Sequence, residues 1–116
     1  PPSFSSFAKL EFLFLYDNEF SGRVDHIFNS TAQVKLSKVL LSGNRFSGPL
    51  PDEFFLLPAI TVINAGSNCM TFELTQAVCN SSKLEVLALD GLHSSKHCCC
   101  LQSSPKRCKQ PTGSCF

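Results

Sequence analysis

The sequence predicts an α/β-type solenoid, a right-handed coil of about four repeats with a short parallel β-sheet on its concave face and returns made of loops and 3-10 turns. Four apolar segments share one pattern, and their starts lie 26, 24 and 24 residues apart. The residues that follow the pattern recur as well. Because such a unit cannot bury its apolar side alone, we expect the repeats to stack on one another. We assign residues 1–97 to the solenoid and residues 98–116 to a cysteine-rich basic tail or cap.

Each segment reads L-x-x-L-x-L-x-x-N, with Ile, Val or Ala in some of the leucine positions. The segments begin at Leu10, Leu36, Ile60 and Leu84, and the last one carries Leu92 in the asparagine position. Side chains alternate between the two faces of a strand, so the later L-x-L positions point inward. The expected core residues are Leu13, Leu15, Val39, Leu41, Ile63, Ala65, Leu87 and Leu89.

The match continues past each segment. Asn18-Glu19-Phe20-Ser21-Gly22 returns as Asn44-Arg45-Phe46-Ser47-Gly48, followed by Pro49-Leu50-Pro51. Over residues 1 to about 92 the chain resembles plant-type leucine-rich-repeat proteins, in particular receptor-like ectodomains, and its third and fourth repeats are similar to algal, especially diatom, repeats. Pro1–Phe4 aligns with Pro51–Phe54. We therefore expect the chain to start within a repeat and to be a fragment of a longer array, with further repeats of the same chain as neighbours.

Asparagines close the first three segments at Asn18, Asn44 and Asn68. An amide side chain both donates and accepts, so inward asparagines can satisfy the backbone of the sharp turn after each strand. The other interpretation is ligand contact, and we favour the structural ladder. Phe20, Phe46 and Met70 are expected to form a second internal column, and Gly22 and Gly48 to permit a tight bend.

The outward positions of the strands form the candidate binding surface, because the resemblance implies that the concave sheet carries most ligand contacts. Phe12, Phe14 and Tyr16 are aromatic without a reason to be in the core, and exposed contiguous apolar surface marks interaction sites. Drift, or contact with missing regions, is the competing explanation for them. The whole predicted set is Phe12, Phe14, Tyr16, Lys38, Leu40, Ser42, Val62, Asn64, Val86, Ala88 and Asp90.

Seven cysteines in 116 residues indicate an oxidising compartment, and the odd number leaves at least one thiol free or paired outside the chain. The sequons at Asn29 and Asn80 agree with secretion and predict glycosylation in the return segments. Disulfide candidates are Cys69 or Cys79 with Cys98, sealing the end of the solenoid. A zinc site in the tail is the weaker alternative, because adjacent cysteines fit a tetrahedral ion poorly. We expect a secreted protein or the extracellular part of a membrane protein.

Charge and motifs exclude several function classes. The formal net charge of +1 offers no general attraction to nucleic acid or to an anionic membrane. No apolar run approaches the length of a membrane span, so this segment is expected to make no membrane contact. The carboxylates are scattered, no nucleophile motif or phosphate loop occurs, and no catalytic residue, cofactor or metal is expected.

The sequence therefore favours a non-catalytic extracellular recognition module that binds a protein or peptide, as part of a receptor-like or adhesion protein. The alternative is a structural cell-wall or spacer protein that is cross-linked through its cysteine tail. Ice or mineral binding through a flat face is disfavoured, because the outward columns lack regular ranks of one residue type.

Overall fold

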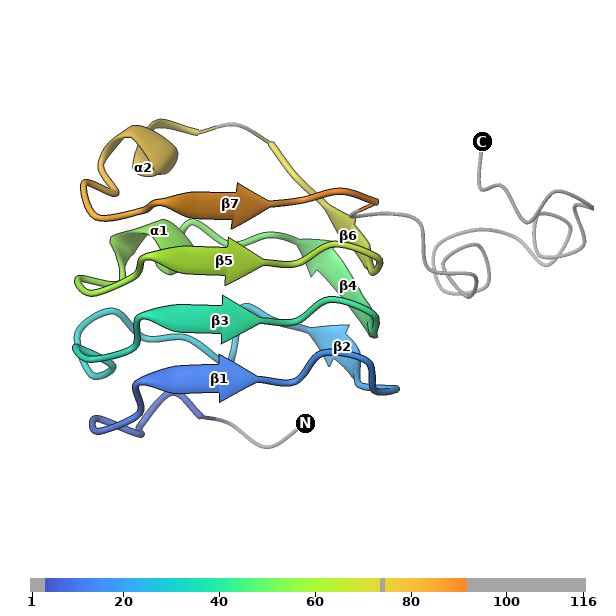
Figure 1. Cartoon of the computed structure of the whole chain (residues 1–116), viewed down its shortest axis with the longest axis horizontal. Coiled ribbons are helices and arrows are strands. Elements are labelled where there is room, and N and C mark those ends of the chain that lie inside the picture. Colours follow the sequence, from blue (N-terminus) through green and yellow to red (C-terminus); the bar gives the residue numbers. More distant parts are fainter. Residues whose placement is uncertain (1–3, 74, 92–116) are drawn as a thin grey trace, which may run out of the picture.

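The chain is an α/β fold with parallel strands in two sheets and few helices. The computed structural model describes residues 4–73 and 75–91. In this part of the chain the main sheet has the strand order β1 (Phe12–Phe14), β3 (Lys38–Leu40), β5 (Val62–Asn64) and β7 (Val86–Ala88). A second sheet contains β2 (Ser21–Arg23), β4 (Arg45–Pro49) and β6 (Cys69–Thr71). Figure 1 shows the successive repeats lying one above the other. The predicted α/β class and the parallel strands of the main sheet are confirmed.

The register of the main sheet follows the sequence repeat. Phe12 pairs with Lys38, Lys38 with Val62, and Val62 with Val86, so equivalent positions of successive repeats lie side by side. The backbone ladder continues beyond the strands, where Leu15 N–H donates to the Leu40 carbonyl at 2.8 Å. Since side chains alternate along a strand, this register places each outward column of the sequence on one face.

The second sheet was not anticipated from the sequence. Its three parallel strands run behind the main sheet, on the side of the chain that follows each sharp turn (Figure 1). Their register is displaced by two residues from the sequence repeat, because Ser21 pairs with Arg45 rather than with its equivalent Ser47. A displacement of two positions keeps each side chain on the same face of its strand. The fold therefore tolerates the shift without exchanging buried for exposed residues.

The returns contain two short α-helices where we expected loops and 3-10 turns. Helix α1 (Glu53–Leu56) buries Phe54 and Phe55, and the ring centroids of Phe54 and Phe28 are 4.1 Å apart. Helix α2 (Gln76–Cys79) buries Ala77. Burial of these aromatic side chains favours a helical turn over an open loop, because each ring removes a large apolar area from water.

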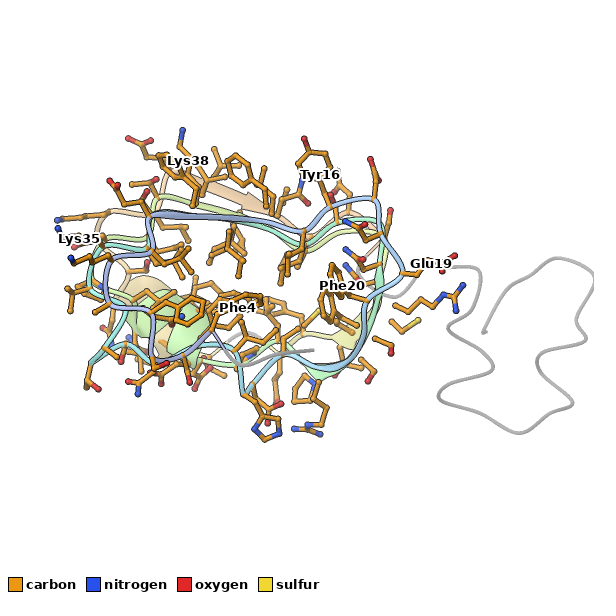
Figure 2. The ribbon with its side chains drawn as sticks, turned by 90° about the horizontal axis from the view of Figure 1, so that it is seen from below. Phe4, Tyr16, Glu19, Phe20, Lys35 and Lys38 are labelled. Carbon is orange, nitrogen blue, oxygen red and sulfur yellow. The ribbon has the colours of Figure 1, made fainter. Side chains whose placement is uncertain are left out.

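The interior lies between the main sheet and the returns. Figure 2 shows Phe4 and Phe20 pointing into this space, with Lys38 and Tyr16 on the outer side of the main sheet. Leu13, Val39, Leu41, Ile63 and Ala65 are buried as predicted. Leu15, Leu87 and Leu89 are half-buried and pack against the same core. They belong to the first and last described repeats, each of which has one neighbouring repeat among the described residues.

One turn position has the left-handed conformation in every repeat. The residue directly before the asparagine position has φ of 55° at Asp17, 71° at Gly43, 51° at Ser67 and 65° at Gly91. Left-handed backbone suits glycine and costs other L-residues roughly 1–2 kcal/mol. Two of the four repeats therefore hold a strained residue at this turn. Gly22 and Gly48 also have positive φ, of 94° and 80°.

Candidate binding surface on the main sheet

Three aromatic side chains lie along β1 and its continuation on the outward face of the main sheet. Phe12, Phe14 and Tyr16 are 51%, 51% and 49% exposed. The ring centroids of Phe12 and Phe14 are 5.8 Å apart, and those of Phe14 and Tyr16 are 6.4 Å apart. We call these residues the aromatic strip. Each ring touches the next, so the strip is a continuous apolar surface that is open to solvent.

Lys38 lies next to the strip on the neighbouring strand. Its Nζ is 5.4 Å from the centroid of the Phe12 ring, a cation–π distance. Neither ion pair of the described residues involves Lys38: they join Arg23 to Asp25 and Arg45 to Glu19. Lys38 is exposed. The face thus offers one cation beside its aromatic rings.

The remaining predicted residues extend this face across β3, β5 and β7. The half-buried ones are Leu40, Ser42, Val62, Asn64 and Ala88, and the exposed ones are Val86 and Asp90. Gly66 is buried in the same column as Tyr16, and a Cβ there would lie 2.4 Å from the Asp90 carbonyl oxygen. That close approach requires a glycine at this position. The strand register places the eight predicted residues of β1, β3, β5 and β7 on one side of the main sheet, and Figure 2 shows Tyr16 on the same side.

Two of the three asparagines are buried rungs between repeats. Asn44 Oδ1 accepts from the Phe20 N–H at 3.1 Å, and Asn68 Oδ1 accepts from the Phe46 N–H at 3.1 Å. Each Nδ2 donates to carbonyls of its own repeat and to one of the preceding repeat, such as Asn68 Nδ2 to the Leu41 carbonyl at 2.9 Å. The side-chain amides of Asn44 and Asn68 therefore form their hydrogen bonds inside the fold and do not contribute to the binding surface.

Asn18 differs from the other two asparagines because it is exposed. Its Nδ2 donates to the carbonyls of Leu15 and Tyr16, both at 3.0 Å and both in its own repeat. Leu92, in the equivalent position of the fourth repeat, lies outside the described residues. In the second internal column, Phe46 and Met70 are buried and Phe20 is half-buried.

Gln33 is a buried polar residue that the repeat pattern did not reveal. It is 0% exposed, and its Nε2 donates to the carbonyls of Phe4 at 2.8 Å and Ile27 at 3.1 Å. Its Oε1 accepts from the Asn29 N–H at 2.8 Å. A fully bonded buried amide of this kind fixes the first return segment against the N-terminal segment.

The sequon asparagines and the described cysteines lie away from the binding surface. Asn29 and Asn80 are exposed in return segments. Cys69 is buried and disulfide-bonded, whereas Cys79 is exposed and its thiol is free. Cys98, like the rest of the predicted tail, lies outside the described residues.

Among the described residues, the pKa shifts concern Arg23 in β2 and Asp25 in the segment that follows it. Arg23 Nε donates to Asp25 Oδ1 at 3.1 Å. This hydrogen bond lowers the pKa of Asp25 and raises the pKa of Arg23. The Arg23 side chain is 53% exposed and that of Asp25 is 33% exposed, so solvent screens the pair and it contributes little to stability.

Comparisons with known proteins add no relative. No protein-family profile matches the chain, and a search of curated proteins finds no match. Among residues 4–73 and 75–91, no three His, Cys, Asp or Glu side chains gather as metal ligands. Within the same ranges, no helix has both the length and the apolar character needed to cross a bilayer.

Proposed function

We propose that the chain is a leucine-rich-repeat solenoid of an extracellular, receptor-like or adhesion protein that binds a protein or peptide through the outward face of its main sheet. The observation that carries the proposal is the aromatic strip. Phe12, Phe14 and Tyr16 are large, half-exposed and contiguous, and they lie on the face of the main sheet that points away from the core. Aromatic side chains in such a setting are typical anchors of protein interfaces.

The repeat geometry supports the class of protein in this proposal. Equivalent residues of successive repeats are paired in the main sheet, and buried asparagines join one repeat to the next. Stacked units that contact only their neighbours are the defining arrangement of solenoids, and their sheets present extended binding surfaces. The outward columns combine aromatic, aliphatic, cationic and amide groups, which suits a peptide with mixed side chains.

A peptide-display library tests the binding surface. Peptides selected on the wild-type chain are expected to bind the Phe14→Asp and Tyr16→Asp variants at least about tenfold more weakly, a loss of about 1.4 kcal/mol. Val34→Asp is the matched control, because Val34 is 49% exposed and lies in a return segment. Peptides that bind wild type and Phe14→Asp equally would remove the aromatic strip from the proposal. Self-association that Phe14→Asp abolishes would assign the face to a second copy instead.

A second candidate is the structural cross-linked protein, and the free, exposed thiol of Cys79 favours it. An exposed thiol can form an intermolecular disulfide under oxidising conditions. In that case non-reducing electrophoresis of the secreted protein shows covalent multimers, and Cys79→Ser reduces their amount. A monomeric band for both proteins contradicts a role of Cys79 in cross-linking.

A further inference from the structure

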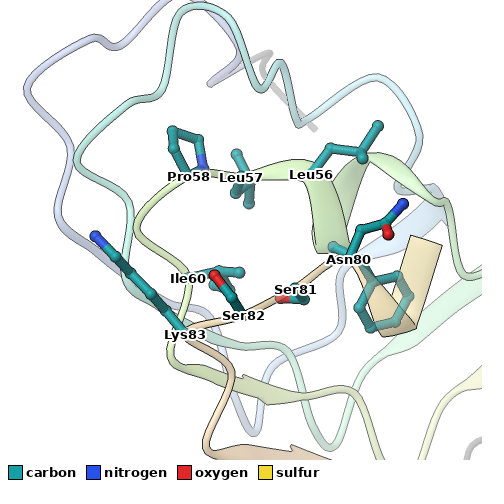
Figure 3. Close-up of a pocket in the computed structure, with 9 residues that line it drawn as sticks. Leu56, Leu57, Pro58, Ile60, Asn80, Ser81, Ser82 and Lys83 are labelled. Atoms are coloured by element: carbon teal, nitrogen blue, oxygen red, sulfur yellow. The ribbon is translucent and has the colours of Figure 1, made fainter.

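A small pocket lies beside the sequon residue Asn80, on the return side of the molecule. Leu56, Leu57 and Pro58 form one wall, and the segment from Asn80 to Lys83 forms the facing wall (Figure 3). Its volume is about 140 Å³. The pocket therefore lies between two successive repeats, at the end of α1 in one and the end of α2 in the next.

The pocket has one exposed apolar wall. Leu56 is 47% exposed, which is high for a leucine at the end of a helix whose other face is core. Ser81 Oγ is buried and has no hydrogen-bond partner among the described residues. The protein itself covers this hydroxyl, so the leucine wall is the part of the pocket that a ligand can contact.

The size of the pocket argues against a free ligand. Sites for free small molecules usually measure about 300–1,000 Å³, and this pocket is well below that range. A group attached covalently at the rim of the pocket has already lost its translational freedom before it contacts the pocket. It can therefore occupy a site that is too small to hold a free molecule. Asn80 supplies such an attachment point, because its exposed side chain makes no hydrogen bond within the described residues and lies beside Leu56 in Figure 3.

We infer that Asn80 carries an N-linked glycan whose first N-acetylglucosamine packs into this pocket, against Leu56. In the modification, Asn80 Nδ2 forms a bond to C1 of the sugar of a lipid-diphosphate-linked oligosaccharide. The bond from C1 to the phosphate oxygen breaks, the lipid diphosphate leaves with the electron pair, and one amide proton is released. The C–H face of the sugar then covers the leucine. This inference depends on the secreted location in the proposed function and not on the aromatic strip.

The other sequon provides an internal contrast. Asn29 Oδ1 accepts hydrogen bonds from the Thr31 N–H at 3.0 Å and from Thr31 Oγ1 at 2.6 Å, so that side chain is held in a local turn. Asn29 does not line the pocket of Leu56. A glycan at Asn29 is therefore expected to leave the melting temperature nearly unchanged.

The experiment uses the full 116-residue chain secreted from eukaryotic cells, with site occupancy measured by peptide mass spectrometry. Ser82→Thr keeps the sequon, whereas Ser82→Ala and Asn80→Gln each remove it, so either of the last two can serve if the other is poorly produced. Native trimming with an endoglycosidase leaves one sugar. We expect Asn80 to be occupied, and the one-sugar form to melt roughly 2–4 °C above the sequon-free forms, the shift that a modest surface contact gives a domain of this size.

Leu56→Ser separates packing in the pocket from a general effect of glycosylation. In this background the one-sugar form and the sequon-free form are expected to melt at the same temperature. An unoccupied Asn80, an unchanged gain in Leu56→Ser, or a gain that disappears on trimming to one sugar would overturn the inference. None of these outcomes depends on peptide capture by the aromatic strip, so failure here is distinguishable from failure of the binding surface.

Discussion

Replacing Asn68 by alanine tests whether the amide rungs hold the repeats together. The side chain of Asn68 is 0% exposed, and its Oδ1 accepts from the Phe46 N–H at 3.1 Å. Its Nδ2 donates to the carbonyls of Leu41 at 2.9 Å and of Ala65 and Gly66 at 3.0 Å each. The substitution removes both functions from a site that water does not reach.

The magnitude depends on which groups lose their partner. The Leu41 carbonyl keeps a bond from Asn44 Nδ2 at 3.0 Å, and the Gly66 carbonyl keeps one from the main chain. The loss therefore falls on the Phe46 N–H and the Ala65 carbonyl. An unsatisfied buried group costs about 1–3 kcal/mol, so we expect the free energy of unfolding to fall by roughly 2–6 kcal/mol.

Asn18→Ala is the matched control, because Asn18 occupies the equivalent position but is exposed. The Leu15 carbonyl keeps a bond from Asn44 Nδ2 at 2.7 Å, and water replaces the rest, so we expect a loss of about 1 kcal/mol or less. Urea unfolding followed by circular dichroism measures both values. Equal losses in the two variants, or a loss below about 1 kcal/mol for Asn68→Ala, would refute the reasoning.

The turn and the surface ion pair give three further predictions. Ser67→Gly is expected to raise the free energy of unfolding by about 0.5–1 kcal/mol in urea titration, because φ at this residue is 51°; a decrease would contradict the strain argument. Gly43→Ala is expected to lower it by about 1–2 kcal/mol, since φ is 71° and the new Cβ would lie 2.5 Å from Asp17 Oδ1; unchanged stability would count against this. Arg23→Gln is expected to raise the pKa of Asp25, because the lost hydrogen bond stabilises the carboxylate. Because the pKa of Asp25 is lower in the folded state, the pair stabilises the fold above the unfolded-state pKa of Asp25, and this stabilisation is lost as the pH falls through the folded-state pKa. An NMR titration of Asp25 that is identical in both proteins would show that the pair does not form in solution.

The strands of the main sheet could be predicted because their residues alternate. Leu13, Val39 and Ile63 recur at one position of the repeat, and the structure places them side by side in the core. The second sheet could not be found in this way. Its first strand, Ser21–Arg23, is exposed at every position and has no apolar alternation. Backbone pairing alone defines that strand, and backbone pairing leaves no trace in side-chain chemistry.

The sequence pattern predicts which residues belong to the candidate surface, but it does not predict how exposed each of them is. Alternation assigns Val62 and Val86 to the same outward column, yet Val62 is half-buried and Val86 is 47% exposed. The difference arises because β5 has a strand on each side, whereas β7 is paired only with β5 among the described strands. Exposure therefore depends on position in the sheet, which a repeat pattern does not contain. Gln33 shows the same limit, because its burial depends on Phe4, a residue distant in the sequence.

The buried amides give the molecule a polarity from one end to the other. Each oxygen that we described accepts from the repeat before its own: Asn44 from Phe20, and Asn68 from Phe46. Loss of an early unit frees main-chain donors of its successor, because the Ser37, Lys38 and Arg45 N–H groups donate to carbonyls of the first repeat. Loss of a later unit frees the N–H that bonded to the asparagine side chain of that unit, such as the Phe20 N–H for the second repeat. Hydrogen exchange at the Phe20 amide thus reports on whether the second repeat is in place, and not only on the repeat that contains Phe20.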